Sequence, residues 1–469
     1  MGKYYLAVDI GASSGRHILG HLENGKIKLE EIYRFENGMD HKDGKLLWNV
    51  DRLFGEILNG MKKCKELGKI PVSMAIDTWA VDYVLLDAQD RILGETYGYR
   101  DHRTDGMDAE TAKILQETEL YAKTGIQKQI FNTIYQLMAV KQKEPELLQR
   151  AKTLLMLPDY FGFRLTGNKL SEYTNGSTTQ LVNPNTFQWD TDLIRKLGYP
   201  EDIFLPLQMP GTKVGQLLPE IQKEVGFNLE VVLCGSHDTA SAVMAVPQAS
   251  GDGIYISSGT WSLMGIESLK PIINKDAAAA NFTNEGGYDH RFRFLKNIMG
   301  LWMIQSVRHE YNDAYSFAQL CEMAEDSRDF PSRVDVNDPS FLSPDSMVEA
   351  IKQYCQKTGQ PVPESVGELA SVVYRSLAQS YGETVSSLEK IAGRTYDSIH
   401  IIGGGSNAAY LNQLTADATG KTVYAGPGEA TAIGNLLAQM IYAEELTDLK
   451  SARQCVRDSF EIKTFVPAK

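Results

Sequence analysis

The sequence lacks the patterns that mark a disulfide-stabilised, membrane-spanning or zinc-binding protein. Its five cysteines, Cys64, Cys234, Cys321, Cys355 and Cys455, are scattered and form no CxxC pair or other metal-ligand spacing. An odd and unclustered set of cysteines favours reduced thiols over a disulfide framework. The eight histidines form no HxH or HExxH pattern, and no apolar run approaches the length of a membrane span. We therefore expect neither a zinc site nor a membrane segment.

Excess positive charge is absent as well. The chain of 469 residues has 47 Lys and Arg against 60 Asp and Glu, a net charge of −13, which argues against a protein that binds the phosphate backbone of nucleic acid. The apolar run of residues 4–8 is the length of a strand and ends in Asp9, unlike a signal peptide. We expect a cytoplasmic protein with no nucleic-acid or membrane partner. The sequence leaves monomer and homodimer both open.

Two common phosphate-binding motifs are also missing. No GxGxxG follows a predicted strand. Gly420-Lys421-Thr422 resembles the end of a Walker A loop, but Thr415 stands where that loop requires its first glycine. Any phosphate binding must therefore come from a different kind of turn.

The hydrophobic pattern predicts an α/β protein that begins with antiparallel strands. We expect strands over residues 4–9, 16–22 and 26–35, a helix over 51–67 ended by Gly68, and further strands over 71–77 and 82–87. A Rossmann unit would instead place a helix directly after the first glycine-rich turn.

A similar order returns after the middle of the chain. Residues 253–258 and 263–266 read as two strands joined by the turn Gly259-Thr260-Trp261-Ser262, and 9–12 can be aligned with 257–260. This echo indicates two related lobes. We place the boundary in the Pro, Ser and Gly cluster at 247–253, and we expect a long helix over 368–392 and a surface loop over 336–346.

The first candidate site is the turn Asp9-Ile10-Gly11-Ala12-Ser13-Ser14-Gly15-Arg16. Small residues let backbone N–H groups approach phosphate oxygens closely. Asp9 is suited to hold Mg²⁺ through water, and Arg16 to neutralise phosphate charge. The alternative is a plain hairpin with a solvated aspartate.

Two further clusters follow predicted buried strands. Ser236-His237-Asp238-Thr239 follows the apolar run 231–233, and an aspartate there can accept a hydroxyl proton in phosphoryl transfer. The alternative is that Asp238 caps a helix starting near Thr239. Gly403, Gly404 and Gly405 follow a strand over 399–402 and leave an open backbone for a purine or phosphate, whereas a tight turn would need only one glycine.

The order of these motifs resembles the ATPase plan shared by sugar kinases, actin and Hsp70-type chaperones. The chain is more closely similar to the FGGY carbohydrate kinases over nearly its whole length. The motifs that carry this resemblance are VDIGASSGR (8–16), IDTW (76–79), VDYVLLD (81–87), DYFGFRLTG (159–167), SHDTASA (236–242), SSGTWSLMG (257–265), KNIMGLW (296–302) and the late triglycine. The resemblance implies two actin-like (ribonuclease H-like) α/β lobes with the active site in the cleft between them. Residues 1–248 would form the sugar-binding lobe and 249–469 the nucleotide-binding lobe.

Within that family the motifs are most similar to the rhamnulokinase branch. This implies phosphorylation of L-rhamnulose at its C1 hydroxyl in rhamnose catabolism, with ATP and Mg²⁺. The resemblance makes Asp238 the general base and Asp9 a water-mediated holder of Mg²⁺. The implied ATP contacts are Ala12, Ser13, Ser14, Gly15, Arg16, Thr260, Gln305 and Gly404. The implied ketose contacts are Ala80, Asp82, His237, Asp238, Thr239 and Asn297.

Other functions stay open at this point. Ala80 stands where that branch often has glycine, which would make the sugar pocket slightly smaller and leaves another ketose, such as L-fuculose or D-xylulose, as an alternative. A non-catalytic ATP switch on the actin or Hsp70 plan, or a sugar sensor, is a second alternative. A switch needs no acid in a sugar cleft, whereas Asp238 beside His237 and Thr239 supplies one. We find no room for the DNA-binding domain of a sensor before Tyr4 or after Lys463.

Overall fold

The computed structural model describes residues 2–248 and 253–468. Part of the boundary expected at 247–253 therefore lies outside the described residues. None of the helices in the described ranges is both long and apolar enough to cross a membrane.

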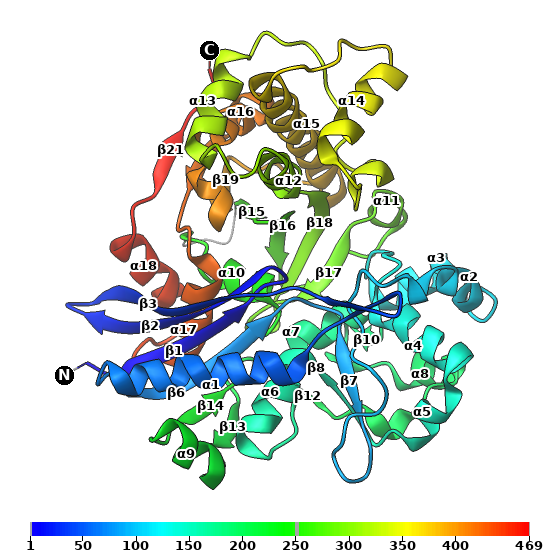
Figure 1. Cartoon of the computed structure of the whole chain (residues 1–469), viewed down its shortest axis with the longest axis vertical. Helices are drawn as coiled ribbons and strands as arrows, with labels where there is room; N and C mark the ends of the chain where they lie inside the picture. Colours follow the sequence, from blue (N-terminus) through cyan, green and yellow to red (C-terminus); the bar gives the residue numbers. More distant parts are fainter. Residues whose placement is uncertain (1, 249–252, 469) are drawn as a thin grey trace. The chain divides into compact units, whose positions relative to one another are not determined.

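The first sheet is built mainly from the N-terminal hairpins (Figure 1). Its strand order is β13-β14-β6-β1-β2-β3. The bounds are β1 Tyr4–Ile10, β2 Ser14–Glu23, β3 Lys26–Glu36, β6 Pro71–Thr78, β13 Lys213–Gln216 and β14 Glu230–Val232. Strands β1 to β3 are antiparallel, and β6 runs parallel to both β1 and β14. Asn24 and Gly25 join β2 to β3 with φ of 53° and 75°, the left-handed geometry of a two-residue hairpin.

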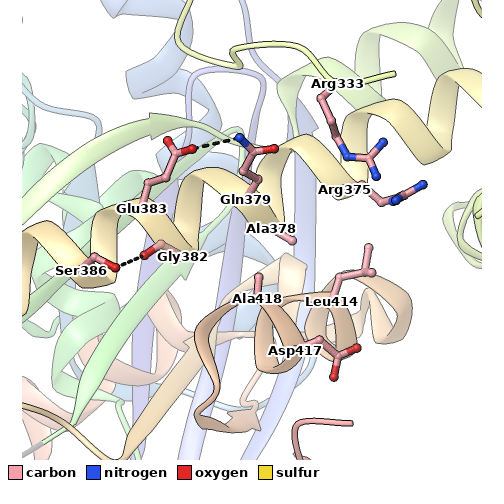
Figure 2. A pocket seen from close by; sticks show the side chains of 10 residues that line it. All are labelled: Arg333, Arg375, Ala378, Gln379, Gly382, Glu383, Ser386, Leu414, Asp417 and Ala418. Atoms are coloured by element: carbon pink, nitrogen blue, oxygen red, sulfur yellow. Dashed lines mark hydrogen bonds between the residues drawn. The ribbon is translucent and has the colours of Figure 1, made fainter. Parts of the chain in front are cut away.

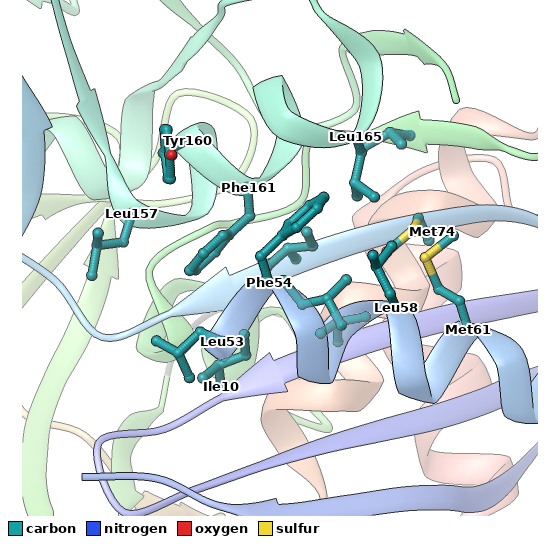
Figure 3. Close-up of a cluster of buried hydrophobic side chains, with 14 of the residues drawn as sticks. Ile10, Leu53, Phe54, Leu58, Met61, Met74, Leu157, Tyr160, Phe161 and Leu165 are labelled. Carbon is teal, nitrogen blue, oxygen red and sulfur yellow. The ribbon is translucent and has the colours of Figure 1, made fainter. Parts of the chain in front are cut away.

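Helix α1 (Val50–Glu66) covers one face of this sheet, because its apolar residues recur at helical spacing. Asn49 caps it by accepting a hydrogen bond from the backbone N–H of Arg52. Figure 3 shows Leu53, Phe54 and Leu58 of α1 in one apolar cluster with Phe161 of helix α6 (Leu157–Thr166). Both helices thus bury an apolar side against the same sheet.

The second sheet repeats the strand plan of the first. Its order is β17-β18-β16-β15-β19-β20-β21. The bounds are β15 Ile254–Ser258, β16 Trp261–Ser268, β17 Thr283–Gly286, β18 Phe292–Met299, β19 Ser398–Ile402, β20 Thr422–Ala425 and β21 Lys463–Phe465. An antiparallel hairpin, β15–β16, stands beside the parallel pair β19 and β20, and β21 is an antiparallel edge strand, as β13 is in the first sheet. The repeat expected from the sequence is therefore present in the topology.

The remaining elements are helices and short strands around these sheets. The helices are α2 Met107–Ala112, α3 Glu117–Thr124, α4 Thr133–Lys143, α5 Pro145–Arg150, α7 Tyr173–Gly176, α8 Thr191–Leu197, α9 Pro219–Val225, α10 Asp238–Met244, α11 Lys275–Ala279, α12 Trp302–Glu310, α13 Phe317–Asp326, α14 Met347–Lys357, α15 Val366–Ala392, α16 Ala409–Thr419, α17 Ala430–Tyr442 and α18 Leu449–Ser459. The short strands are β4 Asp40–Lys42, β5 Lys45–Leu47, β7 Tyr83–Leu86, β8 Thr153–Met156, β9 Ser171–Glu172, β10 Val182–Asn183, β11 Gln188–Trp189 and β12 Leu207–Gln208.

The prediction of a surface loop over 336–346 is partly wrong. Val336 is 1% exposed and Phe341 is fully buried, and a 3₁₀ turn spans Pro339–Phe341. The many turn residues made the segment look solvated, but two apolar side chains anchor it in the protein.

The chain forms two compact units that no single cut separates. One unit comprises residues 1–245, 267–294 and 431–459, and the other comprises 246–266, 295–430 and 460–469. Helix α17 therefore returns to the first unit, where Leu436 and Met440 pack with Tyr5 and Ile18. The assignment of ketose binding to 1–248 and nucleotide binding to 249–469 stays a prediction.

Candidate active site

Three carboxylates come together at the ends of neighbouring strands in the first unit. Asp9 of β1 is paired in register with Asp77 of β6, and the next residue of β6, Thr78, forms a parallel bridge with His237. Asp238 follows His237. Asp9 is 5% exposed and Asp77 is fully buried, whereas the Asp238 side chain is 33% exposed. Of these three acids, Asp238 is therefore the one that a ligand can reach most easily.

Each acid has a different electrostatic environment. Asp9 Oδ2 accepts from Arg16 Nε at 3.0 Å, and Arg16 Nη2 lies 2.9 Å from the same oxygen. Asp77 Oδ2 accepts from Asn435 Nδ2 at 2.6 Å. Burial, and then the nearby charge of Asp9, raise the pKa of Asp77 well above its usual range. The surroundings of Asp77 therefore favour its neutral form.

The pKa of Asp238 is set by opposing effects. Burial raises the pKa of Asp238, the neighbouring His237 lowers it, and the charge of Asp9 raises it again, with a net shift upward. The shift works in the direction that strengthens a base.

The alternative that Asp238 caps the helix is wrong. His237 occupies the N-cap position, without a side-chain capping bond, and Asp238 is the first residue of α10. Thr239 Oγ1 donates to Asp238 Oδ1 at 3.1 Å.

A buried glutamate that sequence reasoning missed holds the segment before Asp238. One oxygen of Glu172, Oε2, accepts from Ser236 Oγ at 2.6 Å and from the Ser236 backbone N–H at 3.2 Å. The neighbouring residue His237 donates its backbone N–H to Thr174 Oγ1 at 3.3 Å. Glu172 lies outside every recognisable motif, so only the structure reveals this anchor.

Asp82 anchors two tryptophans whose rings are in contact. Its Oδ2 accepts from Trp48 Nε1 at 2.6 Å and from Trp79 Nε1 at 2.9 Å, and the two rings lie 4.0 Å apart. Burial raises the pKa of Asp82 to about 6, against the effect of these donors and of Gln136. The side chain is 1% exposed. A direct contact between Asp82 and the ketose stays a prediction. The hydrogen bonds that Asp82 makes show that it orients Trp79, the residue before Ala80.

The backbone is strained at Val81, next to Ala80. The Asp82 N–H donates to the Ala80 carbonyl at 2.9 Å, which closes a three-residue turn, and the central Val81 has φ of 66°. A β-branched residue rarely adopts this conformation, and such strain is concentrated at functional sites.

The turn expected to bind phosphate is a defined loop between β1 and β2. The Gly11 N–H donates to the Ser14 carbonyl at 2.9 Å. Asn37 Nδ2 donates to the Gly11 carbonyl at 2.8 Å, and Ser13 is exposed. A Cβ at Gly15 would lie 2.1 Å from the Phe35 ring, so this glycine is required by packing.

The three late glycines in the second unit have different roles. A Cβ at Gly405 would lie 2.0 Å from Ser258 Oγ, and Gly403 has φ of 81°. A Cβ at Gly404 would meet nothing within 4 Å, and Gly404 is exposed. Packing therefore explains two of the three glycines and leaves the open backbone at Gly404, the residue expected to meet the nucleotide.

The Thr260 turn is held by the start of helix α12, which carries Gln305. The backbone N–H of Trp302 donates to the Thr260 carbonyl at 3.1 Å, and a Cβ at Gly300 would lie 2.5 Å from the Trp261 backbone. In the same unit, Asn297 Oδ1 is buried and has no hydrogen-bond partner among the described residues. An unsatisfied buried acceptor is a site where a ligand hydroxyl can donate.

A surface hollow of about 580 Å³ lies between α15 and α16 (Figure 2). Its two arginines are engaged with backbone, since Arg333 Nη1 donates to the Ser332 carbonyl and Arg375 Nη1 donates to the Phe330 carbonyl. None of the site residues expected from the sequence is among the described residues that line it.

Within residues 2–248 and 253–468 the structure contains no group of three or more His, Cys, Asp or Glu arranged to hold a metal ion. The five cysteines are free.

The sequence models of the FGGY family of carbohydrate kinases match residues 4–245 with the N-terminal domain and 254–443 with the C-terminal domain. The rhamnulokinase of Halalkalibacterium halodurans is 54% identical over 99% of this chain and 99% of its own length. The rhamnulokinases of Oceanobacillus iheyensis and Bacillus subtilis are 51% and 47% identical, each over 99% of this chain and over 98% and 95% of their own lengths.

Solved structures share the fold at much lower identity. A xylulose kinase from Lactobacillus acidophilus matches with a TM-score of 0.80 at 16% identity, over 99% of this chain and 94% of its own. A gluconate kinase from the same organism matches with a TM-score of 0.79 at 17% identity, over 100% of this chain and 94% of its own.

Proposed function

The chain belongs to the FGGY family of carbohydrate kinases, and from that premise we propose that it phosphorylates L-rhamnulose at the C1 hydroxyl with ATP. Family membership confirms the resemblance seen in the motifs, and the structural relatives confirm the actin-like α/β fold class. The substrate is supported by full-length relatives that are named rhamnulokinase. The product is L-rhamnulose 1-phosphate, an intermediate of rhamnose breakdown.

The observation that carries the proposal is the position of Asp238. Its carboxylate is partly open, whereas Asp9 and Asp77 beside it are buried. Asp238 accepts the proton of the C1 hydroxyl while that oxygen attacks the γ-phosphate, and the ADP leaves. Because the transition state of phosphoryl transfer is loose, the carboxylate acts mainly by holding the nucleophile in line.

The residues near Asp9 fit a hydrated magnesium ion. Carboxylate oxygen is the donor that Mg²⁺ prefers, and Mg²⁺ keeps much of its water shell. Asp9 already contacts Arg16, so a water-mediated contact suits it better than a direct bond. The ion would neutralise charge on the phosphates. Ala12, Ser13, Ser14 and Gly15 supply the turn on which the phosphates rest, with Arg16 adding positive charge.

The other proposed ligand contacts come from the resemblance to the family, with support from the unmet hydrogen bonding of Asn297 and the open backbone of Gly404. In the first unit, Ala80, His237 and Thr239 are the proposed ketose contacts, with Asp82 acting through Trp79. In the second unit, the unpartnered Oδ1 of Asn297 is the proposed acceptor for a ketose hydroxyl. Thr260, Gln305 and the open backbone of Gly404 are the proposed nucleotide contacts.

A coupled assay of ADP release tests the proposal. Mg-ATP is supplied with L-rhamnulose, L-fuculose, L-ribulose, D-xylulose or glycerol in turn. The expected result is turnover that strongly prefers L-rhamnulose. Preference for another ketose would keep the kinase and refute the substrate, with Ala80 the first residue to exchange for glycine.

Turnover that no sugar stimulates would refute the kinase proposal and favour an ATP switch.

We also propose that the enzyme acts in the cytoplasm on small molecules, because its substrates ATP and a ketose are found there.

A further inference from the structure

A buried arginine and glutamate contact the back of the His237 ring. Arg293 Nη2 lies 2.9 Å from His237 Nδ1, and Glu285 Oε2 lies 3.4 Å from the same nitrogen. The arginine and glutamate are 3.1 Å apart. Arg293 is fully buried and Glu285 is 6% exposed. Neither residue was among the sites expected from the sequence, since Glu285 and Arg293 lie in β17 and β18, outside every motif.

The Arg293 contact decides which nitrogen of the imidazole carries the proton. A guanidinium group donates hydrogen bonds and accepts none, and its 2.9 Å contact is shorter than the 3.4 Å contact of Glu285 Oε2 with the same nitrogen, so His237 Nδ1 fits the role of acceptor. In a neutral imidazole the proton then resides on Nε2. His237 Nε2 lies 3.4 Å from Asp238 Oδ1. His237 therefore presents an N–H group to the carboxylate proposed as the general base.

Neither Arg293 nor Glu285 can easily turn away from this arrangement. Arg293 Nε donates to the Gly286 carbonyl at 2.8 Å, which fixes the guanidinium plane. A Cβ at Gly286 would lie 2.4 Å from the Tyr173 ring, so the hairpin is packed closely at this point. Glu285 balances the charge of Arg293: burial opposes its ionisation, but the charge of Arg293 brings the pKa of Glu285 below its usual value.

We propose that Arg293 and Glu285 are positioning residues that fix His237 in the Nε2–H form, so that His237 orients the Asp238 carboxylate toward the sugar hydroxyl. The role of Asp238 rests on the proposed function. The form of the His237 ring does not, because it follows from the closer Arg293 contact at Nδ1 and not from the reaction. A carboxylate held by one N–H donor keeps its second oxygen free for the hydroxyl proton, whereas a freely rotating carboxylate loses much of its alignment.

The first test is spectroscopic and uses the intact wild-type protein. Two-bond ¹H–¹⁵N correlation spectra of ¹⁵N-histidine-labelled protein distinguish the protonated ring nitrogen from the bare one, and a His237→Gln variant identifies the signal. We expect a single form of His237, protonated at Nε2. A ring protonated at Nδ1, or an even mixture of both forms, would overturn the proposal whether or not the protein phosphorylates L-rhamnulose.

The second test removes the pair. In Arg293→Met/Glu285→Gln, no charge is left buried without a partner, so folding should be retained. We expect mixed ring forms of His237 and a fall in kcat of about 10- to 100-fold with little change in KM for ATP. Arg293→Lys retains a donor and should recover most of the activity.

The matched control is another buried pair at the opposite end of α10. Arg453 Nη2 contacts Glu267 Oε2 at 2.6 Å and donates to the Val243 carbonyl at 2.9 Å. Arg453→Met/Glu267→Gln should lower stability to a similar degree and leave the ring form of His237 unchanged. Two outcomes would show that Arg293 and Glu285 are structural only. In one, the control variant has as much of a mixture of His237 ring forms as the test variant. In the other, the test variant keeps the Nε2–H form and full kcat.

Discussion

At the scale of single residues, burial separates the roles of acids that look alike in the sequence. Asp9, Asp77 and Asp238 each follow an apolar run, yet their exposed fractions differ widely. A fully buried acid tends to keep its proton, whereas a partly exposed one can exchange a proton with a substrate. The proposed chemistry therefore uses the open acid, whereas the buried Asp9 contacts Arg16 and the buried Asp77 accepts a hydrogen bond from Asn435.

The first prediction concerns the proposed base. Asp238→Asn keeps the size of the side chain but cannot accept the hydroxyl proton, so kcat should fall by at least about 100-fold. The measurement is the ADP-release assay with L-rhamnulose, with a thermal melt to show that the variant is folded. Near-normal turnover by a folded variant would contradict the assignment.

The second prediction concerns acid stability and His17. This histidine is fully buried, its Nε2 contacts the Ile57 carbonyl at 3.2 Å, and burial lowers its pKa to about 4. The unfolded chain binds the proton near pH 6.5 and the folded chain only near pH 4, so this contribution to stability is present above pH 6.5 and is lost as the pH falls.

Urea unfolding of wild type and His17→Gln at pH 7 and pH 4 measures this effect. The difference in the free energy of unfolding between wild type and variant should change by about 3 kcal/mol between pH 7 and pH 4, and the variant should be the less destabilised of the two at pH 4. An equal loss of stability in both proteins would show that His17 does not contribute to acid unfolding.

At the scale of elements, helix α10 is held against helix α17 by a glycine. A Cβ at Gly434 would lie 1.7 Å from the Ser241 carbonyl oxygen, so the two helix backbones nearly touch. Asn435 of α17 also donates to Asp77. Helix α10 begins with Asp238, so this close packing fixes the position of the proposed base.

The third prediction compares two helical glycines. Gly434→Ala must push α10 away and should lower the free energy of unfolding by about 1–3 kcal/mol, with a clear loss of kcat. Gly55→Ala in α1 is the control, because a Cβ there meets nothing within 4 Å, and it should raise stability by about 0.5–1 kcal/mol. Equal effects in denaturant melts would contradict the role of the close approach.

At the scale of the whole molecule, the first unit is completed by a distant part of the chain. Helix α17 covers Tyr5 and Ile18 with Leu436 and Met440, and Gln439 Nε2 donates to the Leu6 carbonyl at 3.0 Å. Without this segment, an apolar face of the first sheet and its buried polar groups would meet water or remain unpaired.

The fourth prediction follows from this arrangement. A chain ending at residue 430 should not show a cooperative thermal transition for the first unit, because α17 and α18 are lost. A chain ending at residue 459 lacks only the edge strand β21 and the residues next to it, so the first unit should still melt cooperatively. Calorimetry distinguishes the two outcomes, and a cooperative, soluble 1–430 chain would refute the dependence on α17.

The early strands, α1, α15 and the repeat of 9–12 near 257–260 could be predicted from the sequence, because periodicity and turn residues are local signals. The glycine turns could be named for the same reason, whereas the role of Asp238 as base came from the resemblance to the FGGY kinases and stays a prediction. The roles of Gly403, Gly405 and Gly15 could not be separated from that of Gly404, since the atoms they pack against lie elsewhere in the chain.

The sequence by itself determined the family, the α/β class and the residue types of the site, since these depend on order along the chain. Only the tertiary structure decided which acids are buried, that Asp82 orients tryptophans, and that Arg293 and Glu285 contact His237. Those properties depend on desolvation and on contacts between residues far apart in sequence, and such contacts exist only after the chain has folded.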